Sequence, residues 1–306
     1  RKILKEFQEY THLPKNYLSV DQFEQQYLVY EHLSEFAAIP NFRRVIQDSY
    51  LKQGKLIGIS PWHQCQTICR YVNGLSEELL LPEEMRRTCG NALGGRVEVL
   101  ARMMMKLEEE GHFIDFSRLQ KETYALLSSH PEIIDRLQKR IRYIMIDEYQ
   151  DTNFIQEQLI RLLGGASQQI FVVGDDDQSI YRFRGASIGN ILGFSKTYET
   201  CHTFKLDTNY RSHPGIVRFC MDWMRGLKSW RGADGRMFRY VKGDIHAASE
   251  ETGTPVLRIT GRSRTECYTR VADFIEGLKK RGQISDYNQV AVLCSSVKNP
   301  NSLVLQ

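Results

Sequence analysis

Apolar residues recur at every third or fourth position through most of the first 110 residues, which is the period of an amphipathic helix. A helix is predicted over residues 96–111, with Gly111 as its stop signal. One face of this helix carries Val97, Leu100, Met104 and Leu107. We expect its methionines in a core rather than at a cofactor. A further helical pattern starts near residue 113 and ends near Ser128 or Ser129.

From residue 141 the pattern alternates between short apolar runs and helical stretches. The runs at 143–146 and 171–173 predict buried strands, and 202–206 predicts a third strand. A helix after the first strand has a capping box of Asn153 and Gln156 and ends at Gly164 and Gly165. The side chains expected to face inward are Phe154, Ile155, Leu159, Leu162 and Leu163. This order is typical of an α/β protein with a parallel sheet.

Two more helices continue this first α/β pattern. A short helix is expected over 187–194, and another helix after Ser212 as cap, with Pro214 in its first turn. Residues 228–254 read as a linker, and a second α/β unit is predicted to start after it. Strands at 255–260 and 289–294 then flank a helix over 263–281, which a capping box of Ser263 and Glu266 would start.

Composition indicates a globular protein. The chain has 306 residues, 42% of them hydrophobic and 25% charged, which is enough for about two domains. No apolar run is long enough to cross a membrane, so we expect a cytoplasmic protein without a membrane partner. The net charge of +4 permits a nucleic-acid partner without requiring one.

The seven cysteines form an odd, scattered set, which favours reduced thiols. His63, Cys65 and Cys69 lie close enough together in the sequence to suggest a metal site. No second ligand pair follows at zinc spacing, so we interpret the two cysteines as a helical core pair.

Acidic residues follow both of the first two predicted strands. Asp147, Glu148 and Asp151 follow the first, and residues 175–177 are three aspartates after the second. Ligands of parallel sheets bind where the carboxyl ends of the strands open. Clustered carboxylates repel one another unless a cation or a basic partner sits among them. An Asp-Glu pair there can hold Mg²⁺ and orient a water for nucleotide hydrolysis, although acids in such turns also cap helices.

Three longer motifs contain or follow these acidic residues. They are "MIDEYQDTN" at 145–153, "GDDDQSIYRFRGA" at 174–186 and "NYRS" at 209–212. In this order and spacing they resemble the superfamily 1A DNA helicases of the UvrD, Rep and PcrA family. The resemblance implies RecA-like motor domains, ATP and Mg²⁺ as cofactors, and 3′ to 5′ movement on DNA. It divides the chain into a helical insertion (1–112), the later half of the first motor domain (113–227), and a linker with the start of the second motor domain (228–306).

The resemblance also implies roles for residues at the hydrolysis site. Asp147 would coordinate Mg²⁺ and Glu148 would be the general base. Gln150 and Asp151 would link the site to its surroundings by hydrogen bonds. Gln178 would contact the γ-phosphate or the attacking water, a task that suits an amide because it donates and accepts without adding charge.

One further group of residues would contact ATP, and another would contact DNA. Arg211 would stabilise charge on the γ-phosphate as an arginine finger, and Tyr210 would stack on adenine. The segment that faces DNA would comprise Tyr181, Arg182, Phe183 and Arg184, in which rings alternate with cations. The family commonly has Gly at the position of Arg182 and Trp at that of Phe183; ring stacking survives the second change. Residues 228–236, with Trp230 among cations, are a secondary DNA candidate.

A phosphate-binding loop ending in Gly-Lys-Thr or Gly-Lys-Ser is absent from the sequence. The nearest glycines, at 90–96, lack the lysine and the hydroxyl. The later motifs of a second motor domain are also absent. We therefore expect a piece of a larger helicase, inactive alone, whose parent acts on single-stranded DNA and duplex junctions with repair or replication proteins. Two alternatives are a truncated protein that binds single-stranded DNA or a partner without hydrolysis, and a parent fused to a nuclease.

Overall fold

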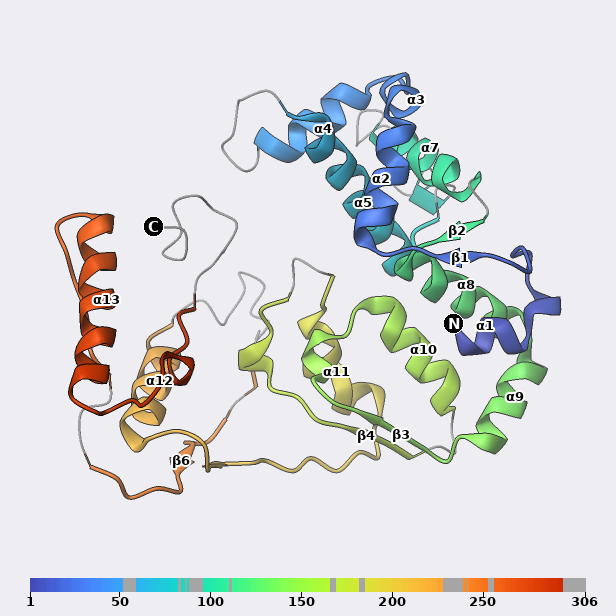
Figure 1. Ribbon diagram of the computed structural model, residues 1–306. Helices are drawn as coiled ribbons and strands as arrows, with labels where there is room; N and C mark the ends of the chain where they lie inside the picture. Colours follow the sequence, from blue (N-terminus) through green and yellow to red (C-terminus); the bar gives the residue numbers. More distant parts are fainter. Residues whose placement is uncertain are drawn as a thin grey trace. The chain divides into compact units, whose positions relative to one another are not determined.

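A computed structural model describes residues 1–51, 59–81, 84–85, 87, 96–109, 112–165, 169–181, 185–227, 239–240, 242–252 and 256–293. The chain forms two compact units (Figure 1). The first comprises residues 1–202 with 230–240, and the second comprises 203–229 with 241–306. No helix in the described ranges is both long and apolar enough to cross a bilayer.

The first unit opens with a helical region. Its elements are α1 (Lys2–Glu6), η1 (Gln8–Tyr10), α2 (Gln22–Glu31), α3 (Leu33–Ala37), α4 (Phe42–Leu51), α5 (Pro61–Glu77) and α7 (Arg96–Glu109). Asp21 starts α2 with a capping box, in which its side chain accepts from Glu24 N at 2.8 Å. The helix predicted over 96–111 is confirmed as α7, and Gly111 lies outside the described residues.

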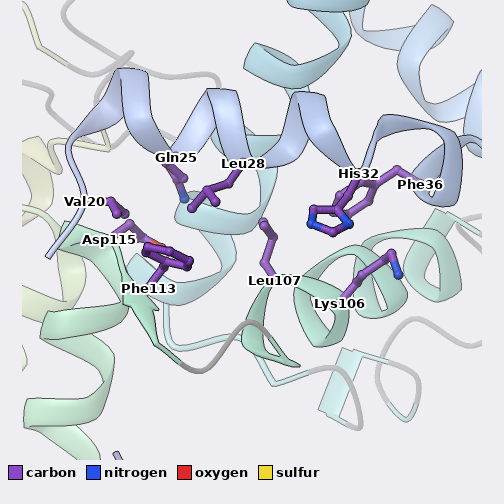
Figure 2. Close-up of a pocket in the computed structure, with 9 residues that line it drawn as sticks. All are labelled: Val20, Gln25, Leu28, His32, Phe36, Lys106, Leu107, Phe113 and Asp115. Atoms are coloured by element: carbon purple, nitrogen blue, oxygen red, sulfur yellow. The ribbon is translucent and has the colours of Figure 1, made fainter. Parts of the chain in front are cut away.

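One apolar core joins helices α2 to α7. Val29, Phe36, Phe42, Ile68, Met103 and Met104 are buried there together with Cys65 and Cys69. The two cysteines are 0% and 3% exposed, as predicted for a core pair. Burial raises the pKa of the Cys65 thiol to about 11, so it stays protonated and unreactive at neutral pH. A pocket between α2 and α7 lies beside this core (Figure 2).

A second core joins the start of the chain to residues after 112. Here α1 packs with α8 (Phe116–Ser129) and α9 (Pro131–Arg140), and β1 (Leu18–Ser19) pairs in parallel with β2 (Phe113–Ile114). The buried side chains include Leu4, Phe7, Leu127, Ile133 and Leu137. The predicted helical insertion 1–112 therefore draws on two cores, and its boundary stays a prediction.

The predicted β-α-β arrangement forms after α9. β3 (Tyr143–Ile146) pairs in parallel with β4 (Gln169–Val172), and α10 (Phe154–Gly164) connects them. Asn153 and Gln156 form the predicted capping box, with bonds of 3.0 and 3.1 Å. Gly164 lets α10 approach the strands, because a Cβ there would lie 2.6 Å from Cδ1 of Ile170.

The expectation of fully buried strands is wrong for this pair. Tyr143 and Met145 are 65% and 75% exposed, and Phe171 is 54% exposed. Side chains of a strand point alternately to its two faces, and α10 covers the face of Ile144 and Ile170. Nothing in the described ranges covers the other face enough to bury it. Phe154, expected to face inward, is 37% exposed.

The first unit continues with α11 (Ile188–Thr197), which confirms the short helix expected there. In the second unit β5 (Thr208–Asn209) pairs in parallel with β6 (His246–Ala247), which lies inside the predicted linker. α12 (Pro214–Gly226) starts with its proline in the first turn, but the cap is His213, whose side chain accepts from Gly215 N. Ser212 was therefore the wrong cap.

The helix predicted over 263–281 is confirmed as α13 (Arg264–Lys280). Ser263 caps it, but the carboxylate of Glu266 accepts from Arg262 N rather than completing the box. The strands predicted at 202–206, 255–260 and 289–294 do not form within their described residues. A strand satisfies its N–H and C=O groups through a neighbouring strand, and no element of the described chain pairs with these segments.

Candidate active site

The parallel pairing of β3 and β4 places their carboxyl ends side by side. The ladder continues past both strands, because Val173 N donates to Ile146 O at 2.8 Å and Tyr149 N donates to Val173 O at 2.9 Å. The turn that contains η3 (Tyr149–Asp151) therefore lies against the turn that contains η4 (Asp176–Gln178). Both acidic segments predicted from the sequence meet at this edge.

Gln150 connects the two turns through its side chain, which is 1% exposed. Its amide nitrogen donates to Glu148 Oε2 at 2.7 Å, and its amide oxygen accepts from Asp175 N at 3.0 Å. Gly174 makes room for this contact, since a Cβ there would lie 2.7 Å from the amide oxygen. A buried amide that satisfies both turns fixes their separation.

Asp147 and Glu148 are exposed at the mouth of the site. Glu148 adopts a left-handed conformation, with φ 50° and ψ 43°, and its N–H donates to Asp147 Oδ1 at 2.9 Å. A residue with a side chain rarely holds this conformation, and such strain is found preferentially at functional sites. Both side chains are open to solvent, so a metal ion or a water can reach their carboxylates.

Asp151 adds a buried oxygen to the same turn. Its Oδ1 is shielded from solvent and has no hydrogen-bond partner among the residues that the structure describes. Burial, and then the charge of Glu148, raises the pKa of Asp151. Magnesium prefers such carboxylate oxygens together with water. The exposed carboxylates of Asp147 and Glu148 offer ligand oxygens of this type, whereas the Asp151 oxygen is shielded from solvent.

The second turn holds three aspartates whose carboxylate oxygens lie within 4.8 Å of one another. Asp175 accepts from Asp177 N at 3.1 Å and from Gln178 Nε2 at 2.9 Å. Asp177 accepts from two nitrogens of Arg239 at 2.7 and 2.8 Å. The repulsion among the carboxylates is thus offset by an arginine, one of the two solutions that the sequence left open.

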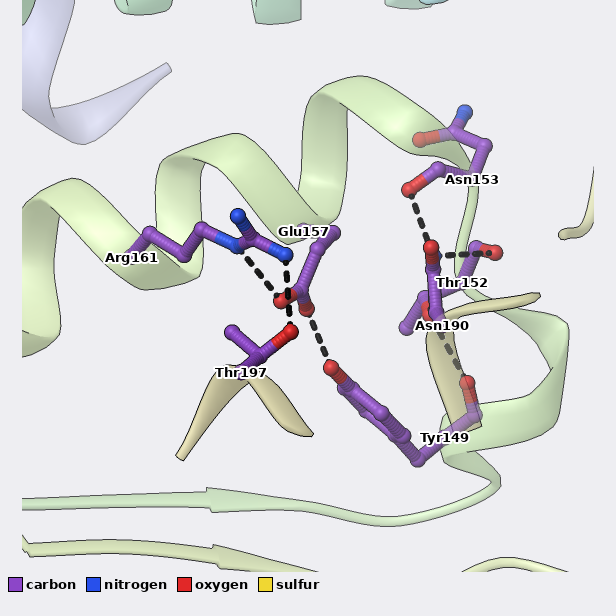
Figure 3. Close-up of polar contacts among 7 residues, drawn as sticks. All are labelled: Tyr149, Thr152, Asn153, Glu157, Arg161, Asn190 and Thr197. Atoms are coloured by element: carbon purple, nitrogen blue, oxygen red, sulfur yellow. Dashed lines mark hydrogen bonds and ion pairs between the residues drawn. The ribbon is translucent and has the colours of Figure 1, made fainter. Parts of the chain in front are cut away.

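A polar network behind the site holds η3 against α10 and α11 (Figure 3). Tyr149 OH donates to the buried carboxylate of Glu157, which also accepts from Arg161 Nε at 2.9 Å. Asn190 on α11 donates to Thr152 O and Oγ1 at 3.1 Å, and Thr152 Oγ1 donates to Tyr149 O at 2.7 Å. Sequence reasoning missed this network, although the spacing of Glu157 and Arg161 by four residues is a signal for a helix ion pair.

Glu77 at the end of α5 joins the helical region to the site. Its Oε1 accepts from Ser117 Oγ at 2.5 Å. A Cβ on Gly185, which has φ +86°, would lie 2.6 Å from Glu77 Oε2. Burial is the main cause that raises the pKa of Glu77, and hydrogen bonds from Ser117 and Asn153 oppose it. Nothing in the sequence singled out this residue.

The remaining predicted residues are distributed between the two units. Tyr181 follows the second turn and is 36% exposed. Tyr210 and Arg211 are exposed in the second unit, where Arg211 N donates to Asn209 Oδ1 at 2.9 Å. Outside the described residues lie Arg182, Phe183, Arg184 and the segment 228–236.

The fold and the site define an α/β protein with clustered carboxylates at the carboxyl ends of parallel strands. The chain belongs to the UvrD/REP helicase family, because the N-terminal domain of that family matches residues 1–199. It resembles the ATP-dependent DNA helicase PcrA of Leuconostoc citreum, with 33% identity over 71% of this chain and 26% of that protein.

Two further relatives support the same assignment. The ATP-dependent DNA helicase PcrA of Bacillus subtilis is 37% identical over 58% of this chain and 25% of its own length. DNA helicase II of Escherichia coli is 33% identical over 54% of this chain and 24% of its own length. The chain therefore spans about a quarter of the length of the relatives that it matches.

Removing the hydroxyl of Tyr149 should destabilise the first unit. Tyr149→Phe leaves one oxygen of buried Glu157 without its donor, and we expect a loss of about 1–3 kcal/mol in the free energy of unfolding. Tyr143→Phe is the matched control, because this ring is 65% exposed and its change should stay within about 0.5 kcal/mol. Urea denaturation of both variants measures the difference, and equal losses would contradict the network.

Glu77 should make stability depend on pH. Because its pKa is raised in the folded chain, the unfolded chain loses the proton first as pH rises above 4.5. The free energy of unfolding therefore falls as pH rises from 4.5 to the pKa of Glu77 in the folded chain. The lower stability persists at neutral pH. Glu77→Gln keeps an acceptor for Ser117 without the charge, so it should be more stable relative to wild type at pH 7 than at pH 4.

Urea denaturation at these two pH values measures the comparison for Glu77→Gln. Glu31→Gln, at an exposed position of α2, is the control for replacing a carboxyl by an amide. A difference between Glu77→Gln and wild type that is the same at both pH values would contradict the assignment of a raised pKa.

Proposed function

We propose that this chain is part of an ATP-dependent DNA helicase that moves 3′ to 5′ on single-stranded DNA and unwinds duplex junctions. In this proposal residues 113–227 are the later half of a RecA-like motor domain, and residues 228–306 lead into a second one. Residues 1–112 are the helical insertion. The observation that carries the proposal is the Gln150 bridge between Glu148 and Asp175, which joins both acidic turns in one site.

Hydrolysis of ATP assigns different tasks to the two exposed acids. Mg²⁺ on the phosphates would neutralise charge during transfer of the phosphoryl group. Asp147 would hold this ion, and Glu148 would orient and deprotonate the attacking water. Gln150 engages one oxygen of Glu148, and we assign the other oxygen of this exposed side chain to the water. The left-handed backbone at Glu148 holds that orientation before substrate binds.

Gln178 would report the state of the nucleotide. Its amide nitrogen donates to Asp175 Oδ2 at 2.9 Å, in a turn held by Gln150. A γ-phosphate near the strand ends offers a competing acceptor, so binding of ATP would draw the amide away from Asp175. Arg211 and Tyr210 would join from the second unit, as arginine finger and adenine platform. Closure of two units on one nucleotide is a common means of coupling hydrolysis to movement.

DNA would bind along the segment that follows Gln178. Tyr181 provides an exposed ring next to Arg182, Phe183 and Arg184. Stacking on such rings is worth about 1–3 kcal/mol per base and tolerates every sequence, as a translocating motor requires. The relatives named above carry the names of DNA helicases, two of them ATP-dependent, which supports this substrate and this energy source. Repair or replication proteins are the partners we propose.

The decisive experiment measures steady-state ATPase activity of the full-length protein with and without single-stranded DNA. We expect stimulation by DNA, and a loss of about 100-fold or more in kcat for Glu148→Gln, because the general base is removed. Glu199→Gln, at an exposed position outside the site, is the matched control and should retain wild-type turnover.

Two other results would contradict the proposal. Full turnover by Glu148→Gln would remove the assigned base. DNA binding by a full-length protein that never hydrolyses ATP would instead favour the truncated DNA-binding alternative. The 306-residue chain alone is expected to show no steady DNA-stimulated turnover.

A further inference from the structure

We propose that Arg239 is a positioning residue for Gln178, which it controls by holding the turn 175–178 through Asp177. Arg239 lies far outside the three motifs, in a segment that the sequence identified as a linker. The inference rests on the proposed function, since Gln178 has a task only if the site binds a nucleotide.

The contact between Arg239 and Asp177 is a two-point ion pair. Arg239 Nε donates to Asp177 Oδ1 at 2.7 Å, and Nη2 donates to Oδ2 at 2.8 Å. The two side chains are only 15% and 16% exposed. A guanidinium matches a carboxylate in this geometry and fixes both its position and its plane. Partial burial shields the pair from screening by salt.

Tyr240 strengthens the same attachment. Its backbone N–H donates to Asp176 Oδ2 at 2.8 Å, and its hydroxyl donates to Ile191 O on α11 at 2.6 Å. Asp176 is 5% exposed, so its carboxylate depends on protein donors rather than on water. Residues 239–240 therefore bind two of the three aspartates and the neighbouring helix.

The positive charge of Arg239 offsets the negative charge of the three aspartates in the turn. The oxygens of three aspartates converge within 4.8 Å, and the pair with Asp177 raises the pKa of Arg239 further above its ordinary value. An arginine side chain is not deprotonated in proteins, so the guanidinium stays charged. Without it, the negative charge of the turn would increase, and Asp175 would hold the amide of Gln178 more strongly.

A continuous path runs from Arg239 to the acids of the first turn. Asp177 N donates to Asp175 Oδ1, and Asp175 Oδ2 accepts from Gln178. Asp175 N in turn donates to Gln150, which donates to Glu148. The chain enters the second unit directly after Tyr240.

A residue that only stabilises the fold and a residue that positions Gln178 predict different effects of substitution on kcat. We expect Arg239→Ala in the full-length protein to lower the DNA-stimulated kcat for ATP by about ten- to a hundredfold, because a small misplacement of a catalytic group has effects of this size. KM for ATP should change by less than about threefold, since the proposal gives Arg239 no contact with the nucleotide. The double variant Asp177→Arg with Arg239→Asp restores the pair and should recover most of kcat.

Controls separate this inference from the proposed function. Arg225→Ala breaks an exposed pair with Asp244, in which the side chains are 53% and 60% exposed, and should leave kcat unchanged. If wild type is stimulated by DNA and Glu148→Gln is inactive, but Arg239→Ala has wild-type kcat, the positioning role is overturned and the helicase proposal stands. If wild type lacks DNA-stimulated turnover, both are overturned.

A conservative variant covers the case in which Arg239→Ala does not fold. Arg239→Lys keeps the charge but loses the second donor, so a positioning role predicts a kcat lower by about three- to tenfold with a normal melting temperature. Wild-type kcat for Arg239→Lys would overturn the role that we assign to the two-point contact.

Discussion

The parallel pairing of β3 with β4 is the constraint on which the site depends. Parallel strands end at the same edge, so the acidic turns after Ile146 and Val172 must lie next to each other. The backbone bonds of Val173 and Tyr149 carry this register into the turns. Gln150 can then span the remaining gap, because both of its amide atoms find partners at hydrogen-bond distance. A shift of one residue between the strands would separate these partners.

This arrangement concentrates negative charge, and the surrounding residues offset it at different places. Exposed Asp147 and Glu148 are solvated, whereas buried Glu157 has Arg161 and the Tyr149 hydroxyl, and Asp177 has Arg239. Two features of the site are unfavourable for the stability of the fold. They are the left-handed backbone of Glu148 and the unpartnered oxygen of Asp151. Both lie where a cation and a water are proposed to act, which is consistent with a local loss of stability in exchange for reactive groups.

Local signals in the sequence identified local structure well. The capping box of Asn153 and Gln156 and the position of α7 were predictable because neighbouring residues determine them, and the strand-helix-strand order predicted the parallel pairing of β3 with β4. The motifs selected Asp147, Glu148 and Gln178, whose roles stay predictions.

Long-range contacts were not predictable in the same way. Arg239 reaches Asp177 across 62 positions and Glu77 reaches Ser117 across 40, and no pattern of spacing encodes such pairs. The apolar runs of β3 and β4 indicated burial on both faces, but a run shows only that the side chains are apolar, not which face a neighbouring element covers. Extended segments such as 202–206 also need a partner strand before they count as strands.

The central claim is that the two paired strand ends form one site for ATP and Mg²⁺. The most direct test is a crystal structure of the full-length protein with Mg²⁺ and a non-hydrolysable ATP analogue. The account predicts Mg²⁺ on the Asp147 carboxylate, directly or through one water, and the amide of Gln178 turned from Asp175 to the γ-phosphate. An analogue bound away from both strand ends, with Asp147 and Glu148 still in solvent and Gln178 still on Asp175, would contradict it.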